Sequence, residues 1–347
     1  MAKQNAVFGA ITDLSPGAVT VTGGTARFDP ADRRTERHLA LLEDLRRRKM
    51  PVYIETDPAG LVARIYLPNL VRVESIRESP SGEISVTFER SHARHGVPRD
   101  AEGEEALRTL REAGKDRWLA VTVNERQEIL DVRHYDPPFD LPRLEPPPRI
   151  SWWRWCWWPW NWFGRYCCVS ARRAQELFDL CAVTTCDPLT VPPPCIPFKY
   201  PDDGCWGRAH EMRRLMLAAG TASKKVWIDG SLHTPTNNNP NCFVNWGWHV
   251  APTVCVRRFR WFPFIFKGPM VIDPSLFKTP VSKATWKSVQ GDPSATLTDT
   301  EGWVFSRWGG YQADPGYVQT NQVLADYRTQ LQLRSLGPAG PPPYACP

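Results

Sequence analysis

Cysteine is absent from the first 150 residues, although the chain of 347 residues contains ten. All ten follow that point: Cys156, Cys167, Cys168, Cys181, Cys186, Cys195, Cys205, Cys242, Cys255 and Cys346. So abrupt a change in cysteine use predicts two modules, of which the second resembles disulfide-bonded extracellular modules. The alternative, that these thiols are buried and free, stays open at this point.

Long apolar runs and a strong charge are also missing. No run approaches the ~18–20 apolar residues that span a bilayer, so stable membrane insertion is not expected. Residues 1–150 carry 23 basic and 24 acidic side chains, and the remainder carries 20 and 13. A positive balance so mild and so scattered does not predict a nucleic-acid partner. The amino terminus lacks the apolar segment of a secretory signal.

Motifs for metals and nucleotides are missing as well. The chain has no CxxC, no HExxH, and neither a Walker nor a dinucleotide-binding glycine motif. A metal site is therefore not predicted.

Proline marks a boundary between the two modules. Residues 137–148 hold six prolines, which favours an extended linker. We therefore predict a first domain at 1–136, a linker at 137–170, a second domain at 171–336 and a disordered tail at 337–347.

Tryptophan is concentrated in one part of this linker. Seven of the 16 tryptophans fall in SWWRWCWWPWNWF (151–163). The favoured interpretation is an ordered linker whose rings pack against both modules. A substrate surface and contact with a membrane interface stay open.

Local patterns predict an α+β fold. In the first module, helices are expected over Asp29–Arg48 and Ala101–Ala113, among short strands. In the second, helices over Arg172–Cys181 and Asp202–Ala219 precede a run of short strands. Helices followed by antiparallel strands are typical of α+β domains.

Cys205 differs from the other cysteines in its position. It follows Asp202, Asp203 and Gly204 at the start of a predicted helix. The positive end of the helix dipole lowers a thiol pKa from about 8.5 into the range of roughly 3.5–7.5. Free N–H groups of the first turn can also stabilise an oxyanion. Cys205 is therefore a candidate nucleophile, and a structural or disulfide cysteine is the alternative.

A thiol nucleophile needs a base, and His249 is the best candidate. It lies in the predicted strand NWGWHVAPTV, where Trp246 and Trp248 would exclude water. A buried core histidine is the alternative. His210 on the helix of Cys205 is expected at the surface, and His233 is expected to be exposed in a loop.

Asp273 is the candidate for the carboxylate that orients the imidazole. It ends an apolar strand, one strand after that of His249. An Asx turn before Ser275 is the alternative. Cysteine, histidine and aspartate in this order, from helix N-terminus to strand to strand, are typical of papain-like and transglutaminase-like cores.

Three segments together resemble the bacterial protein-glutamine glutaminases, also called protein deamidases. They are CIPFKYPDDGCWGRAHEMRRLM (195–216), WGWHVAPTV (246–254) and VIDPSLFKTPVSKATW (271–286). The stretch TARFDPADRRTERHLALLEDLRRRKMPVYIE (25–55) is similar, more loosely, to the pro-region of that family. The resemblance implies a transglutaminase/papain-like catalytic core preceded by a smaller α+β pro-like domain.

The resemblance also implies an activity. Cys205 would attack the side-chain amide of a glutamine in a protein or peptide, His249 would serve as base and acid, and Asp273 would orient it. A thioester intermediate, release of ammonia, no cofactor, an activating protease and secretion are implied as well. One of Trp206 and Trp248 is a candidate for lining the substrate slot. Packing of these side chains in the core is the alternative.

Two further expectations concern the proenzyme and the cysteines. The strand around Ala26 and Arg27 is expected to lie across the cleft of the uncut chain, where arginine offers no amide to hydrolyse. Cys186 and Cys195 bound a short loop and are the first candidates for a disulfide.

Other functions stay open. The same triad serves transglutaminases and cysteine peptidases. A non-enzymatic binding protein and a deamidating toxin delivered without a signal peptide are further alternatives.

Overall fold

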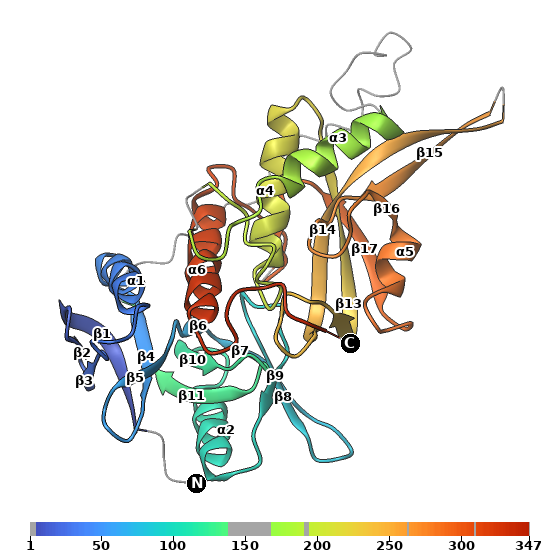
Figure 1. Ribbon diagram of the computed structural model, residues 1–347. Coiled ribbons are helices and arrows are strands. Elements are labelled where there is room, and N and C mark those ends of the chain that lie inside the picture. The colour runs from blue at the N-terminus through green and yellow to red at the C-terminus, as the bar shows by residue number, and fades with distance from the viewer. Residues whose placement is uncertain (1–4, 138–167, 191–193, 262–263, 309, 347) are drawn as a thin grey trace. The chain divides into compact units, whose positions relative to one another are not determined.

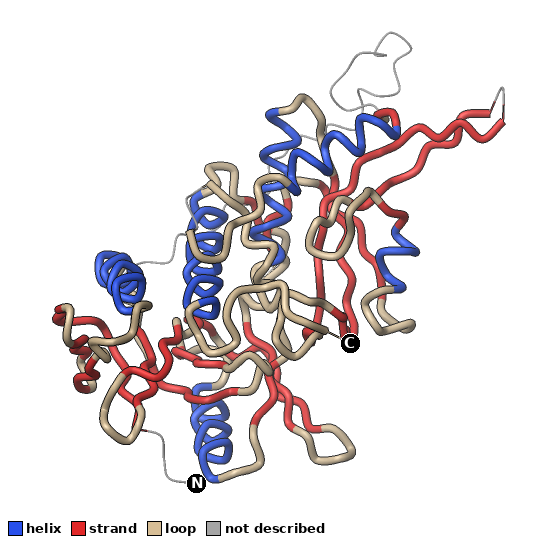
Figure 2. The backbone as a smooth tube through the Cα atoms, viewed as in Figure 1, coloured by secondary structure: helices blue, strands red, loops and turns tan. Residues whose placement is uncertain are grey.

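The chain folds into two compact units in a computed structural model, which describes residues 5–137, 168–190, 194–261, 264–308 and 310–346 (Figures 1 and 2). The first unit comprises Met1–Asp140, Pro188–Thr190 and Arg328–Tyr344. The second comprises Leu141–Asp187, Val191–Tyr327 and Ala345–Pro347. The tryptophan-rich segment and most of the predicted linker lie outside the described residues. No helix of the described chain is long and apolar enough to cross a membrane.

The first unit is mainly β-structure (Figure 2). Its sheets have the strand orders β3-β2-β1-β4-β5, β11-β10-β6 and β7-β8-β9. Its elements up to residue 137 are β1 (Asn5–Ser15), β2 (Ala18–Val21), β3 (Gly24–Arg27), α1 (Thr35–Arg47), β4 (Pro51–Thr56), β5 (Val62–Tyr66), β6 (Asn69–Val71), β7 (Val73–Glu78), β8 (Ile84–Phe88), β9 (His95–Val97), α2 (Ala101–Ala113), β10 (Leu119–Val123) and β11 (Ile129–His134).

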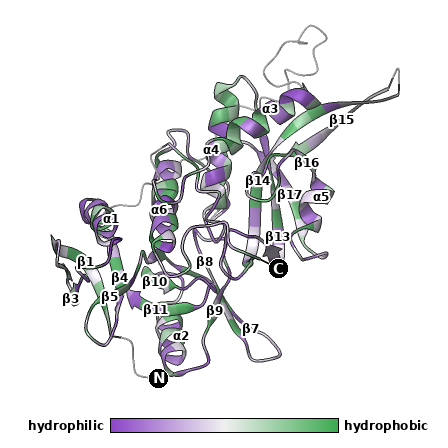
Figure 3. Cartoon of the chain, in the orientation of Figure 1, coloured by the Kyte–Doolittle hydropathy of each residue, from purple (hydrophilic) through white to green (hydrophobic). Residues whose placement is uncertain are grey.

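The helices of this unit each bury one apolar stripe. Leu42 and Leu45 of α1 are fully buried in a core that also contains Val52 and Ile54 of β4. Leu110 of α2 is fully buried in a second core, and residues of both polarities are visible around that helix (Figure 3). Apolar residues three and four apart produce such stripes.

The first helix begins later than its sequence predicts. Instead of starting at Asp29, α1 starts at Thr35. The carboxylates of Asp29 and Asp32 accept hydrogen bonds from the backbone N–H groups two residues on, those of Ala31 and Arg34, at 2.9 Å each. Such Asx turns compete with the first helical turn and delay it.

The second unit is built on one mostly antiparallel sheet. Its strand order is β16-β15-β14-β13-β17, with β12 paired parallel to β14. The elements are β12 (Val169–Ser170), α3 (Ala171–Ala182), α4 (Cys205–Ala218), β13 (Lys224–Pro235), β14 (Phe243–Trp261), β15 (Phe264–Val271), β16 (Val281–Ser282), α5 (Lys283–Ser288), β17 (Thr296–Glu301), β18 (Val304–Ser306), β19 (Gln312–Ala313) and α6 (Val318–Ser335). The predicted α+β class is confirmed.

Helices cover both faces of this sheet (Figure 1). The α4 side chain of His210 meets Lys225 on one face, while Trp286 of α5 packs on His249 on the other. Trp286 shares a fully buried apolar cluster with Val226 and Val271. Because neighbouring residues of a strand point to opposite faces of the sheet, β14 contributes side chains to the packing on both faces.

Two features of the second half differ from their predictions. The sequence predicts separate short strands before and after residue 247, whereas β14 is one strand of 19 residues. The segment 318–335, for which no element is predicted, forms α6. Its residues Arg328–Ser335 belong to the first unit, so the second domain does not extend to 336 as predicted.

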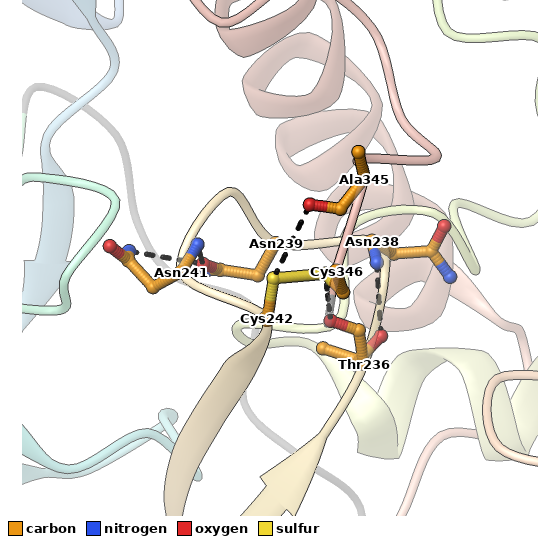
Figure 4. Close-up of a disulfide and its surroundings, with 7 residues drawn as sticks. All are labelled: Thr236, Asn238, Asn239, Asn241, Cys242, Ala345 and Cys346. Atoms are coloured by element: carbon orange, nitrogen blue, oxygen red, sulfur yellow. Dashed lines mark hydrogen bonds between the residues drawn. A yellow bond between two sulfur atoms is a disulfide. The ribbon is translucent and has the colours of Figure 1, made fainter.

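The cysteines form three disulfides among the described residues: Cys168–Cys255, Cys186–Cys195 and Cys242–Cys346. The pair 186–195 is the one that its short loop suggests. The tail prediction is wrong, because Cys346 is bonded to Cys242 at the loop between β13 and β14 instead of being disordered (Figure 4). Cys181 and Cys205 are buried free thiols.

Candidate active site

Cys205 is the first residue of α4, as predicted from its position after three turn-forming residues. Gly204 precedes it with φ +84°, in the left-handed region that favours glycine. A Cβ at Gly204 would lie 2.3 Å from the ring of Tyr327. Glycine is therefore required here twice over, for its backbone conformation and for the space beside α6.

Buried hydrogen bonds fix the loop that leads to Cys205. The guanidinium of Arg208 is buried and donates to the carbonyls of Tyr200 at 2.9 Å and Asp203 at 2.5 Å. The amide of Asn239, in the loop after β13, donates to the carboxylate of Asp202 at 2.7 Å. The bonds of Arg208 come from within α4, and that of Asn239 comes from the loop after β13; together they hold the backbone before Cys205 in place.

His249 and Asp273 form a buried hydrogen-bonded pair. The distance from His249 Nε2 to Asp273 Oδ2 is 2.9 Å, and both side chains are at most 3% exposed. Asp273 also accepts hydrogen bonds from Trp286 Nε1, at 2.8 Å, and from the hydroxyl of Ser275. The imidazole stacks on Trp246 with ring centroids 4.5 Å apart. Orientation of the ring is thus set by a carboxylate and by stacking.

The structure brings Cys205 to this pair. Its Sγ lies within 4.8 Å of a ring nitrogen of His249. Because Nε2 bonds Asp273, Nδ1 is the ring nitrogen suited to exchange a proton with the thiol. The thiol of Cys205 on α4, the imidazole of His249 on β14 and the carboxylate of Asp273 after β15 thus lie next to one another in this order.

The pKa of Cys205 does not fall as its helix position predicts. Burial raises it well above its ordinary value, and the nearby Arg208 and the Val250 N–H oppose this only in part. At 1% exposure, loss of solvation outweighs the helix dipole.

The pKa of Asp273 lies below its ordinary value of 3.8. Burial raises it, but the charge of His249 and the hydrogen bonds from His249, Ser275 and Trp286 outweigh burial. Such a carboxylate stabilises the fold above the unfolded pKa, and the contribution is lost as the pH falls through the lower folded pKa. The carboxylate stays ionised throughout the neutral range.

Removing one of these hydrogen bonds is expected to shift acid unfolding. Ser275→Ala raises the folded pKa of Asp273, so the second unit should lose this contribution at a higher pH than the wild type does. Circular dichroism during acid titration measures the midpoint. Ser288→Ala, at an exposed residue whose hydroxyl donates to the Thr285 carbonyl, is the matched control. Equal midpoints for Ser275→Ala and the wild type would contradict this assignment.

The predicted substrate residues Trp206 and Trp248 belong to a cluster of indoles. Trp206 is only 2% exposed and thus packs mainly in the core, whereas Trp248 is half-buried. Trp308, which the sequence analysis missed, lies 5.2 Å from Trp206 and 5.8 Å from Trp248 between ring centroids. Arg307 stacks 4.4 Å above Trp227, and its guanidinium pairs with Asp229. In the sequence, Arg307 and Trp308 are adjacent and lie outside the three motifs, so no motif drew attention to them.

Truncating Trp308 is expected to weaken binding of a peptide substrate. Trp308→Ala removes a half-buried indole beside the residues adjacent to Cys205 and His249, so we expect KM to rise about tenfold with kcat little changed. Tyr311→Ala, at an aromatic side chain that is 48% exposed, serves as the control. Unchanged KM in Trp308→Ala, measured by ammonia release, would show that Trp308 does not contact the substrate.

The structure also places His210 and His233, the two histidines of this half that were not chosen as the base. His210, expected at the surface, is 1% exposed, and its Nδ1 lies 3.0 Å from the side-chain nitrogen of the buried Lys225. The apolar contacts of α4 on the sheet bury it, which a five-residue offset from Cys205 does not reveal. His233 is exposed, as predicted, but it lies in strand β13 and not in a loop, and its Nδ1 lies 2.8 Å from Asn245 Oδ1.

Ala26 and Arg27, expected to lie across the cleft, are in β3 of the first unit. Ala26 is fully buried in that unit's own core. Arg27 is exposed, and its guanidinium donates to the carbonyl of Ala59 at 2.5 Å. Of the two, only Arg27 offers its side chain to the surface.

Comparisons with known proteins agree on one family. Residues 174–290 match the model of a family described as "Glutaminase". A solved structure of pro-protein-glutaminase is similar with a TM-score of 0.52 and 23% identity, covering 75% of this chain and 91% of that one. A mutant of pro-protein-glutaminase has the same coverage and TM-score at 25% identity. Protein-glutaminase from Chryseobacterium proteolyticum is 30% identical over 47% of this chain and 89% of its own, with a TM-score of 0.41. A search of curated proteins found no match.

Proposed function

The chain belongs to the protein-glutaminase family through residues 174–290, and from this we propose that Cys205, His249 and Asp273 deamidate glutamine side chains in proteins. The observation that carries the proposal is the buried His249–Asp273 pair beside a free thiol at a helix N-terminus. Water accepts the acyl group, so glutamate and ammonia are the products.

In the first half-reaction, His249 Nδ1 takes the proton of the Cys205 thiol, and the thiolate attacks the side-chain carbonyl carbon of glutamine. The oxyanion faces the N–H of Cys205 at the start of α4, and one such donor is typically worth about 10²–10³ in rate. The C–N bond then breaks, and the imidazolium gives its proton to the leaving ammonia. A thioester remains on Cys205.

In the second half-reaction, His249 Nδ1 takes a proton from water, and the oxygen of that water attacks the thioester carbonyl. The C–S bond breaks, glutamate leaves and the thiol recovers the proton. Asp273 accepts from Nε2 throughout, which stabilises the imidazolium that forms twice in each cycle.

We also propose that the intact chain is a secreted proenzyme that a protease activates. The similarity to pro-protein-glutaminase structures over 75% of this chain supports a pro-region in the first unit. The three disulfides favour an oxidising compartment. Arg27, exposed on β3, is the pro-region residue that we propose to occupy the cleft without turnover.

Ammonia release from a glutamine-rich protein tests the activity, measured before and after digestion of the first unit. We expect release to rise on digestion and to disappear in Cys205→Ala. Incorporation of a primary amine instead of ammonia release would assign a transglutaminase, and cleavage of the substrate backbone would assign a peptidase. No ammonia in any form, with the digestion verified on a gel, would contradict the proposal.

A further inference from the structure

The first unit is completed by a segment from the far end of the chain. Arg328–Tyr344 belongs to this unit, although almost 200 residues of chain separate it from the end of the unit's main part at Asp140. It contains the last two turns of α6 and the loop that follows. The residues before and after it belong to the second unit.

A buried side chain and a hydrogen bond attach this segment to the first unit. Leu333 is buried in the same core cluster as Leu42 and Ile54. The guanidinium of Arg34 donates to the carbonyl of Leu336 at 2.8 Å.

Polar contacts extend the attachment to other elements. The side-chain amide of Gln330 donates to Asn69 Oδ1 in β6 at 2.9 Å. Arg48, at the end of α1, donates to the Thr329 hydroxyl at 3.3 Å. The segment thus contacts α1, β6 and the core between them, so it is an integral part of this unit.

Both ends of the segment are covalently fixed to the second unit. On one side α6 continues without a break into Tyr327, whose ring stacks on Tyr200 at 5.7 Å and meets Trp206 edge-on at 6.1 Å. On the other side the disulfide to Cys242 holds Cys346 at the loop after β13 (Figure 4).

We propose that Arg328–Tyr344 is a docking segment that keeps the first unit bound to the second after the linker between them has been cut. A single cut in 138–167 severs the peptide chain but leaves the docking segment in the core of the first unit. Reducing the 242–346 disulfide does not release it either, because α6 stays continuous.

For regulation, this inference rests on the proposed function: activation of the proenzyme would require digestion of the first unit, not one cut. The binding itself does not depend on any activity. A failure of the deamidase proposal and a failure of the docking proposal therefore give different results.

A full-length chain with a site-specific protease sequence inserted within residues 138–150 tests the docking segment. After complete cutting, verified on a denaturing gel, we expect both fragments to elute together in native gel filtration. Separate elution of the two fragments at micromolar concentration, from the cut chain with no further substitution, would overturn the proposal.

Variants show whether this segment is the element that holds the fragments. Leu333→Ala is expected to raise the dissociation constant of the cut pair at least ~30-fold, because it leaves a cavity in the first unit's core. Gln332→Ala, on the same helix at a half-buried position, is the control.

A second variant covers the case in which Leu333→Ala fails to fold. Arg34→Ala with Gln330→Ala removes two hydrogen bonds without a core cavity and is expected to weaken the cut pair about tenfold or more. An unchanged dissociation constant in this folded double variant would contradict the proposal, because the fragments would then be held elsewhere.

Discussion

Replacing Cys205 by serine is expected to lower the rate of ammonia release by about 10³-fold or more. The oxygen of serine is a far weaker nucleophile than sulfur at neutral pH, and removal of a nucleophile disables a catalytic unit that works as a whole. Ammonia release from a glutamine-rich protein, after digestion of the first unit, measures the effect.

The chain offers a matched control for this variant. Cys181 is also a free, buried thiol, and burial raises its pKa to about 12. Cys181→Ser should therefore leave the rate nearly unchanged. Full activity of Cys205→Ser, or equal losses in both variants, would show that Cys205 is a structural cysteine.

Replacing His249 by glutamine is expected to reduce ammonia release by about 10²–10⁴-fold, the range typical of a lost general acid–base group. Glutamine has a polar group of similar reach, but it neither takes the thiol proton nor gives one to ammonia. Single-turnover measurement of ammonia release separates this loss from weaker substrate binding.

His233→Gln is the control for this substitution, since His233 is exposed and lies on the neighbouring strand β13. Its rate should equal that of the wild type. A His249→Gln variant that keeps wild-type kcat would place the proton transfer on another group.

The sequence pointed to the three candidate site residues through local signals combined with the resemblance of three motifs to one family. A Gly-Cys pair after two aspartates marks a helix start, and an apolar run that ends in Asp273-Pro274 marks a strand end. These signals depend on backbone preferences within a few residues. The comparisons support the family, and the triad itself stays a proposal.

The sequence did not reveal which of these side chains are buried in the folded protein. The raised pKa of Cys205 comes from its removal from solvent, and the burial of His210 comes from the face of β13 beneath it. Neither depends on adjacent residues. Trp308 was missed for the same reason, because its indole partners are about 60 and 100 residues away in sequence.

The C-terminal helix was missed for a different reason. Residues 318–335 are largely polar, so their apolar stripe is weak, although Leu324, Tyr327 and Leu331 recur at helical spacing. This helix changes from one unit to the other at Arg328. No local pattern marks that change, because it depends on which core Leu333 enters.

The most direct test of the central claim is deamidation of a glutamine-containing protein in water enriched in heavy oxygen, with the first unit digested. We predict one glutamate for each ammonia released, and one heavy oxygen in the side chain of each new glutamate, because water cleaves the thioester on Cys205. Product formed without heavy oxygen, or in equal amount by Cys205→Ser, would contradict it.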